Sequence, residues 1–180
     1  MKLFDNYYFV YIKYVLSHRD DRILVDFFRR KGIQIGDNCH IYSSIVTPES
    51  YLINIGNNVT IAPGTCLLTH DNSVSKLSNN FTDTFGRIII GDNCFIGANS
   101  IILPGVELGK NTIVAAGSVV TKSFEGNVVI GGNPAKIISK IEDYKNKIEK
   151  YCCDVRNMSY AEKKIFLLSN HSIFRLDISC

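Results

Sequence analysis

Aliphatic residues recur at every sixth position through the middle of the chain. The uninterrupted part of this pattern comprises Ile90, Ile96, Ile102, Leu108, Val114 and Val120. Small or turn-forming residues follow most of them, as in the Gly91-Asp92-Asn93 segment after Ile90. A helix would instead need apolar residues three and four apart, and an ordinary sheet strand would alternate for longer before it turned. The six-residue unit therefore predicts a short strand followed by a corner, with three units making one triangular coil.

Successive coils of such a solenoid are expected to pair in parallel, about 4.8 Å apart. The repeat then places Ile90 over Leu108, Ile96 over Val114 and Ile102 over Val120, with all six side chains directed inward. Glycine, asparagine and aspartate at the corners tolerate the tight backbone. The same period is visible upstream, in Ile35, Ile41, Ile55, Ile61 and Leu67. It is interrupted once, by two extra residues between Ile41 and Ile55.

The two ends of the chain follow a different pattern. Apolar residues at helical spacing predict an amphipathic helix over residues 3–16 and a second helix over 19–31. Packing of the first helix on the rest of the protein or on a partner subunit is favoured over contact with a membrane. Beyond Lys136 the pattern again turns helical, and a capping box from Ser159 to Glu162 predicts a further helix. The expected division is residues 1–31, a solenoid over 32–139, and a helical extension over 140–180.

The repeat is broken by one long insertion, between Leu67 and Ile90. Residues 71–87 of this insertion are rich in Asn, Ser and Thr, and an insertion in a repeat scaffold is expected to form a surface loop that often carries function. His70 stands immediately before it. A histidine titrates near neutral pH, so it suits removal of a proton from a hydroxyl that attacks a thioester. On the residues alone, a surface histidine beside a loop is the more conservative interpretation.

Several segments carry a resemblance to a known family. The decapeptide that begins at Ile90, the segment that begins at Ala116 and the closing Gly132-Asn-Pro-Ala-Lys136 resemble the hexapeptide-repeat acyltransferases, and especially the sugar O-acetyltransferases among them. The resemblance covers roughly residues 33–140. It implies an all-β solenoid that is a left-handed parallel β-helix, here with N-terminal and C-terminal α-helical extensions. It also implies acetyl-coenzyme A (acetyl-CoA) as the co-substrate and a homotrimer with active sites between subunits.

The same resemblance identifies His70 as the catalytic base. Asp71 is a candidate to orient its imidazole. Adjacent residues on an extended segment point in opposite directions, however, so a backbone carbonyl or another acid remains an alternative. Asn72 is expected to contact the acceptor, and Phe95 offers either an apolar wall beside the thioester or a core side chain. The sequence lacks the proline that galactoside and maltose acetyltransferases carry directly after this histidine, so their acceptor specificity does not transfer.

The donor is expected along the later coils. Small residues there allow the pantetheine arm to approach the backbone; they are Ala98, Ala115, Ala116, Gly117 and Ser118. By resemblance, Ala98 and Ala116 touch the pantetheine, and Thr121 and Lys122 lie near the nucleotide. Lys136 is expected to reach the 3′-phosphate as a point charge.

Composition excludes several other classes of function. The net charge is only +3 and no basic run resembles a nucleic-acid footprint. The six cysteines and four histidines show no metal-ligand or redox spacing, so no metal is predicted. No signal peptide or transmembrane segment is identified, and the cysteines are interpreted as reduced thiols of a cytoplasmic protein. Three functions remain: O-acetylation of a sugar hydroxyl, with a surface polysaccharide or its precursor as the expected acceptor; N-acetylation of an amino-sugar nucleotide or small amine; and a non-catalytic trimeric scaffold.

Overall fold

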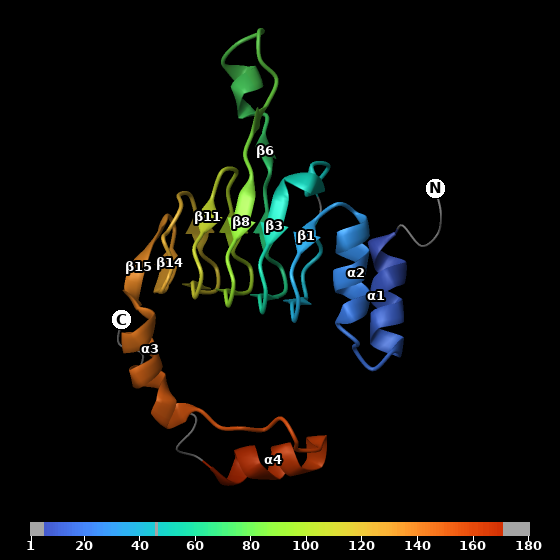
Figure 1. Ribbon diagram of the computed structural model, residues 1–180, viewed down its shortest axis with the longest axis vertical. Helices are drawn as coiled ribbons and strands as arrows, with labels where there is room; N and C mark the ends of the chain where they lie inside the picture. Colours follow the sequence, from blue (N-terminus) through green and yellow to red (C-terminus); the bar gives the residue numbers. More distant parts are fainter. Residues whose placement is uncertain (1–5, 46, 171–180) are drawn as a thin grey trace.

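Short parallel strands stack into three sheets that form the faces of a parallel β-helix (Figure 1). The computed structural model describes residues 6–45 and 47–170. Face A consists of β1 (Gln34–Ile35), β3 (Ile53–Ile55), β8 (Ile88–Ile90) and β11 (Glu107–Leu108). Face B consists of β2 (His40–Ile41), β4 (Thr60–Ile61), β9 (Phe95–Ile96), β12 (Ile113–Val114), β14 (Val128–Gly132) and β15 (Ala135–Lys140). Face C consists of β5 (Cys66–Leu67), β10 (Ile101–Ile102) and β13 (Val119–Val120).

The strand register follows the six-residue repeat. Leu108 pairs with Ile90, Val114 with Ile96 and Val120 with Ile102, which confirms the three predicted stacks. All six side chains are at most 1% exposed. Full burial of an aliphatic side chain contributes about 1.5–3 kcal/mol, so these columns form the main stabilising core of the coil.

Asparagine occupies the corner between faces A and B in every coil. The residues are Asn38, Asn58, Asn93, Asn111 and Asn127, all with φ between 54° and 57°. Asparagine is enriched in this left-handed region because its side chain bonds locally. The Asn38 amide donates to Asn58 Oδ1 at 2.8 Å, and the Asn58 amide donates to Asn93 Oδ1 at the same distance. These bonds join successive coils and hold the corner that the repeat predicts.

At the corner between faces B and C, the coils approach too closely for a side chain. A Cβ added to Gly97 would lie 2.5 Å from the Ala116 nitrogen and 2.6 Å from the Val114 oxygen. Real Cβ atoms do not approach backbone this closely, so glycine is required at position 97. The result is a corner at which backbone groups are accessible.

The first coil is irregular. Between β2 and β3 lies the stretch with the two extra residues noted in the repeat, and it contains the short 3-10 helix η2 (Ser50–Leu52) instead of a strand on face C. This stretch also carries Glu49, which lies beside the start of the long insertion.

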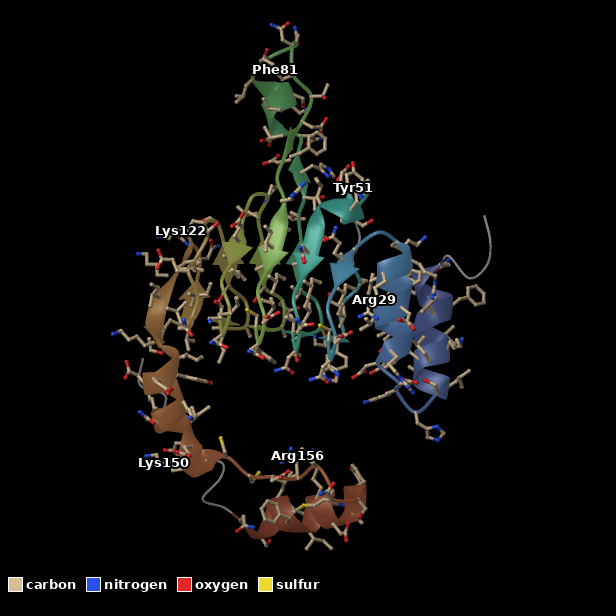
Figure 2. All side chains as sticks on the ribbon, viewed as in Figure 1. Arg29, Tyr51, Phe81, Lys122, Lys150 and Arg156 are labelled. Atoms are coloured by element: carbon tan, nitrogen blue, oxygen red, sulfur yellow. The ribbon has the colours of Figure 1, made fainter. Side chains whose placement is uncertain are left out.

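The insertion forms an arm rather than an irregular loop. β6 (His70–Asp71) pairs antiparallel with β7 (Thr84–Phe85), and η3 (Ser73–Lys76) lies between them. The arm projects from the corner between faces C and A well beyond the coils, with Phe81 near its far end (Figures 1 and 2). The sequence predicts that His70 stands just before a surface loop. In the structure it is the first residue of the arm.

Two predicted helices cap the N-terminal end of the coil. They are α1 (Tyr7–Leu16) and α2 (Arg22–Arg30), and residues 3–5 of the predicted first helix lie outside the described residues. Leu24 and Phe28 of α2 are 1% exposed. Arg29 fixes α2 to the first coil, because its guanidinium donates to the carbonyls of Ile35 (3.1 Å) and Gly36 (2.7 Å). One face of α1 packs on the rest of the protein, as predicted, since Val10 and Tyr14 are buried.

The C-terminal elements are β15, α3 (Ile141–Ile148), η4 (Glu149–Tyr151) and α4 (Tyr160–Ser169). The predicted capping box is confirmed at the start of α4, where Ser159 and Glu162 bond reciprocally. The helical pattern assigned beyond Lys136 begins only at Ile141, because residues 135–140 form a strand that pairs antiparallel with β14. Within residues 6–45 and 47–170, the structure contains no helix with the length and apolar character needed to cross a membrane.

Candidate active site

His70 is paired with a carboxylate that the sequence did not single out. Its Nδ1 lies 2.8 Å from Oε2 of Glu49, on the irregular part of the first coil. The His70 side chain is 37% exposed and the Glu49 side chain only 16%. In the neutral imidazole, a carboxylate at this distance favours the tautomer with its proton on Nδ1, so that Nε2 carries the free lone pair. Nε2 has no hydrogen-bond partner among the described residues, so it is available to a substrate.

Two threonines fix the orientation of Glu49. The Thr69 hydroxyl donates to Glu49 Oε2 at 3.0 Å, and the Thr47 hydroxyl, 3.3 Å from the same oxygen, is hydrogen-bonded to the Thr69 hydroxyl. Desolvation by burial acts to raise the pKa of Glu49, but the hydrogen bonds from His70 and Thr69 outweigh it and hold that pKa below its ordinary value. Glu49 is therefore a fixed anion at neutral pH.

Asp71, the candidate that the sequence offered to orient the imidazole, makes no hydrogen bond to His70 within the described part of the chain. It follows His70 on the extended strand β6, is exposed, and its Oδ1 accepts a hydrogen bond from the backbone N–H of Ser73 at 2.8 Å. That bond holds the pKa of Asp71 below its ordinary value. The arrangement corresponds to the alternative in which another acid orients the imidazole. Asp71 instead stabilises the turn at the base of the arm.

Phe85 and Asn72 also lie at the base of the arm. The Phe85 ring, on β7, lies with its centroid 6.0 Å from that of His70. Phe85 is 60% exposed, so it offers an apolar surface beside the reactive nitrogen that sequence reasoning did not identify. Asn72 is exposed at the start of η3, where a ligand could reach it.

A second feature, here termed the alanine groove, lies along face B and its corner with face C. It is an apolar cavity of about 640 Å³, lined on the coil by Ala98, Ala115, Ala116 and Phe95, with α3 as the opposite wall. Phe95 is 44% exposed, so it is not a core side chain and the apolar-wall interpretation is the one that fits.

Backbone donors are available along the alanine groove. The N–H groups of Ala98 and Ala116 make no hydrogen bond to any described residue. The next N–H along the chain, that of Gly117, is not available, because it donates to the Ala98 carbonyl at 2.8 Å. Ser118 is 1% exposed and its hydroxyl donates to the Ala115 carbonyl at 2.6 Å, so its side chain holds the corner. Gly117 supplies the left-handed turn there, with φ of 71°.

The predicted nucleotide-end residues meet at the C-terminal end of the coil. Lys122 and Lys136 line one cavity of about 440 Å³, together with Phe124, and Thr121 is exposed next to Lys122. The Lys122 ammonium lies 5.6 Å from the centroid of the Phe124 ring. Figure 2 shows Lys122 at this end of the coil, near β14. The two cations provide a site where a phosphate group could be held.

His70 and the alanine groove lie at different corners of the coil. His70 leaves the corner between faces C and A, whereas Ala98 and Ala116 follow β9 and β12 at the corner between faces B and C. One chain therefore does not bring these two halves of the predicted site together.

Two other histidines and two cysteines have structural surroundings, whereas His171 lies outside the described residues. His40 pairs through Nδ1 with Asp21 Oδ2 at 2.5 Å, and His18 lies in the turn between α1 and α2. Burial raises the pKa of the Cys39 and Cys94 thiols, and neither forms a disulfide. The described residues contain no group of three or more His, Cys, Asp or Glu side chains that could hold a metal ion.

Known proteins share this repeat and fold. A family model described as the hexapeptide repeat of succinyl-transferase matches residues 87–122. Protein CapG of Staphylococcus aureus is 49% identical over 149 residues, which cover 80% of this chain and 87% of CapG. Galactoside O-acetyltransferase of Escherichia coli is 37% identical over 113 residues, which cover 62% of this chain and 56% of that enzyme. The structure of a hexapeptide-repeat acetyltransferase of Vibrio cholerae with acetyl-CoA superposes with a TM-score of 0.55, at 32% identity over 61% of each chain.

Matches of this extent establish the class of protein as a hexapeptide-repeat acyltransferase. Within that class the chain belongs to the hexapeptide-repeat acetyltransferase family, and the resemblance visible in its sequence is confirmed. The chain spans most of the length of CapG but little more than half of the galactoside enzyme.

Proposed function

We propose that this protein transfers an acetyl group from acetyl-CoA to a sugar hydroxyl, with His70 as the general base. The observation that carries the proposal is the His70–Glu49 pair, in which the neutral imidazole presents the free lone pair of Nε2. The galactoside relative is named for O-acetylation, and the Vibrio cholerae relative binds acetyl-CoA in its solved structure. A surface polysaccharide or its precursor is the proposed source of the sugar.

In the proposed reaction, Nε2 of His70 takes the proton of the acceptor hydroxyl as its oxygen attacks the thioester carbonyl. A tetrahedral intermediate forms, its carbon–sulfur bond breaks, and the imidazolium returns the proton to the departing thiolate. The products are the O-acetyl sugar and free coenzyme A. Glu49 stabilises the positive imidazolium that exists between the two proton transfers, so it lowers the barrier without itself being protonated.

The donor is proposed to lie along the alanine groove. The free N–H groups of Ala98 and Ala116 suit the carbonyl oxygens of a pantetheine arm, and Phe95 supplies an apolar wall. Lys122 and Lys136 supply positive charge for the phosphates of the nucleotide end. Ser118 contributes by holding the corner in shape rather than by direct contact.

A complete site requires a second subunit in this proposal. His70 lies at the corner between faces C and A, and the alanine groove lies at the corner between faces B and C. The two meet only when the His70 corner of one subunit faces the alanine groove of its neighbour. A homotrimer of left-handed coils, as the family resemblance implies, satisfies this condition with three equivalent interfaces. The arm that begins at His70 would then cover the acceptor from the side opposite the donor.

A thiol-release assay with acetyl-CoA tests the proposed function. We expect release above the rate of hydrolysis with sugars that offer a free hydroxyl, and a product that carries an O-acetyl ester by mass spectrometry. Amino-sugar nucleotides and small amines serve as the matched acceptors for N-acetylation. Turnover of the amines alone would overturn the O-acetyl assignment, and binding of acetyl-CoA without turnover of any acceptor would favour a scaffold.

Lys136→Ala is expected to raise the KM for acetyl-CoA roughly tenfold, about 1.4 kcal/mol, while kcat changes little. The reason is that Lys136 is proposed to contact a phosphate that remains bound in the same way throughout the reaction. Steady-state kinetics with varied acetyl-CoA measure the effect, and Lys110→Ala, an exposed lysine at another corner, is the control. An unchanged KM for acetyl-CoA would remove Lys136 from the donor site.

A further inference from the structure

The outer face of α1 is apolar and exposed. Its residues are Tyr8, Phe9, Ile12, Val15 and Leu16, whose exposed fractions range from 47% to 76%. The opposite face, with Val10 and Tyr14, packs inward, so α1 is apolar on both sides. Lys13 is the one charged residue within α1. A helix that is apolar all round is normally covered on all sides, which indicates that a further surface covers the outer face.

The position of α1 restricts what that surface can be. α2 packs on the first coil, and α1 lies beyond α2 as the outermost element at that end of the solenoid (Figure 1). Tyr7 joins the two helices, with ring centroids 6.2 Å from Phe27 and 6.0 Å from Phe28. A subunit that packs beside the coils would cover faces A, B or C and not this end. The covering surface must therefore approach along the coil axis.

The charge of this end favours a negative partner. Residues 1–31 contain seven Lys and Arg against four Asp, whereas residues 32–180 contain thirteen of each sign. The whole net charge of +3 thus comes from the segment that includes the two capping helices. A second copy stacked end to end would bring two positive ends together, which is unfavourable. An anionic surface is attracted by the same charge.

We propose that the outer face of α1 docks on an anionic lipid surface, with the helix lying in the plane of the membrane. Ten residues of helix are about 15 Å long, too short to span a hydrocarbon core of about 30 Å. Lys13 adjoins the apolar side chains of the outer face of α1, and α2, which follows in the chain, contains Arg22, Arg29 and Arg30. Apolar side chains with basic charge nearby favour binding at the lipid–water interface. The attraction combines apolar burial with charge, so both are needed for binding. This inference does not depend on the acetyl-transfer reaction.

Co-sedimentation of the full-length protein with vesicles tests the proposal. The probes are vesicles of phosphatidylcholine alone and of phosphatidylcholine mixed with phosphatidylglycerol. We expect binding to the mixed vesicles, weakened by added salt, and little binding to the neutral ones. The double variant Ile12→Ser, Leu16→Ser is expected to bind the mixed vesicles at least tenfold more weakly, because it places hydroxyls on the apolar face.

A second double variant controls for the general loss of exposed apolar area. Ile165→Ser, Leu168→Ser changes two side chains of α4 that are 69% and 64% exposed, and it should bind the vesicles like the unmodified protein. Circular dichroism and thermal unfolding show that both variants remain folded. The proposal is overturned if the unmodified protein stays in the supernatant, or if the α1 variant binds as well as the α4 variant. It is also overturned if the protein self-associates end to end and the α1 variant abolishes that assembly instead.

Discussion

His70→Ala is expected to slow acetyl-CoA-dependent thiol release by a factor of about 10²–10⁴, the usual contribution of general acid–base catalysis. The alanine variant cannot take the proton of the acceptor hydroxyl, and no other described side chain replaces the Nε2 that His70 presents. The fold should persist, because His70 is partly exposed and lies outside the buried aliphatic columns. Thiol release with a verified acceptor gives kcat, and circular dichroism with size-exclusion chromatography checks folding and assembly.

His18→Asn is the matched control for this experiment. His18 has a φ of 59°, a backbone conformation that asparagine also adopts, and it lies in the turn between α1 and α2, far along the chain from the arm. It should retain the turnover of the unmodified protein. Near-normal turnover of His70→Ala would show that His70 is not the base, whatever the fold of the variant.

The six-residue repeat is sufficient to predict the register of the coil. Parallel pairing between coils leaves one way to bury every aliphatic position at once, since a shift by a single residue would turn Ile96 and Val114 outward. The asparagine corners follow from the same constraint, because position 93 and its equivalents need a left-handed backbone. The register and the corners both follow from short patterns that repeat along the chain, so they can be predicted from the sequence.

Glu49 could not be predicted in the same way. It lies 21 residues before His70 in the chain, on a stretch that follows no repeat, and its contact depends on how two coils pack. The only local signal was the pair of extra residues between Ile41 and Ile55. An irregularity that survives in a repeat scaffold often has a functional reason, and here it places a carboxylate beside the base. Asp71 was more conspicuous in sequence, but its position on an extended strand directs it away.

The strand β15 shows a second limit. Ile137 and Ile138 are adjacent and both largely exposed, so residues 135–140 show no alternation that would mark a strand. Their extended conformation is set by antiparallel pairing with β14, which is a tertiary contact. That pairing ends the coil and places Lys136 beside Lys122. The position of the predicted phosphate site therefore depends on contacts that local pattern does not encode.

Glu49→Gln is expected to lower kcat about 10- to 100-fold, with little change in the KM for acetyl-CoA. An uncharged amide stabilises an imidazolium less well than a carboxylate, so the acid limb of the kcat/KM profile should also move to lower pH. The folded protein holds the pKa of Glu49 below its ordinary value. The Glu49 charge therefore stabilises the fold fully at pH values above the ordinary pKa, and this stabilisation is lost as the pH falls through the lowered pKa of the folded state. At neutral pH the pair is intact in the unmodified protein.

Asp71→Asn separates a positioning role from a general effect of removing negative charge near the base. Asparagine can still accept the Ser73 N–H, so the turn should persist, and we expect the pH profile of this variant to match that of the unmodified protein. A Glu49 that acted only as a structural anchor would lower thermal stability without moving the acid limb. If instead Asp71→Asn moved the acid limb and Glu49→Gln did not, the adjacent aspartate would be the residue that orients His70 in solution. The two variants therefore identify which carboxylate orients His70, because only that carboxylate stabilises the positive imidazolium during proton transfer.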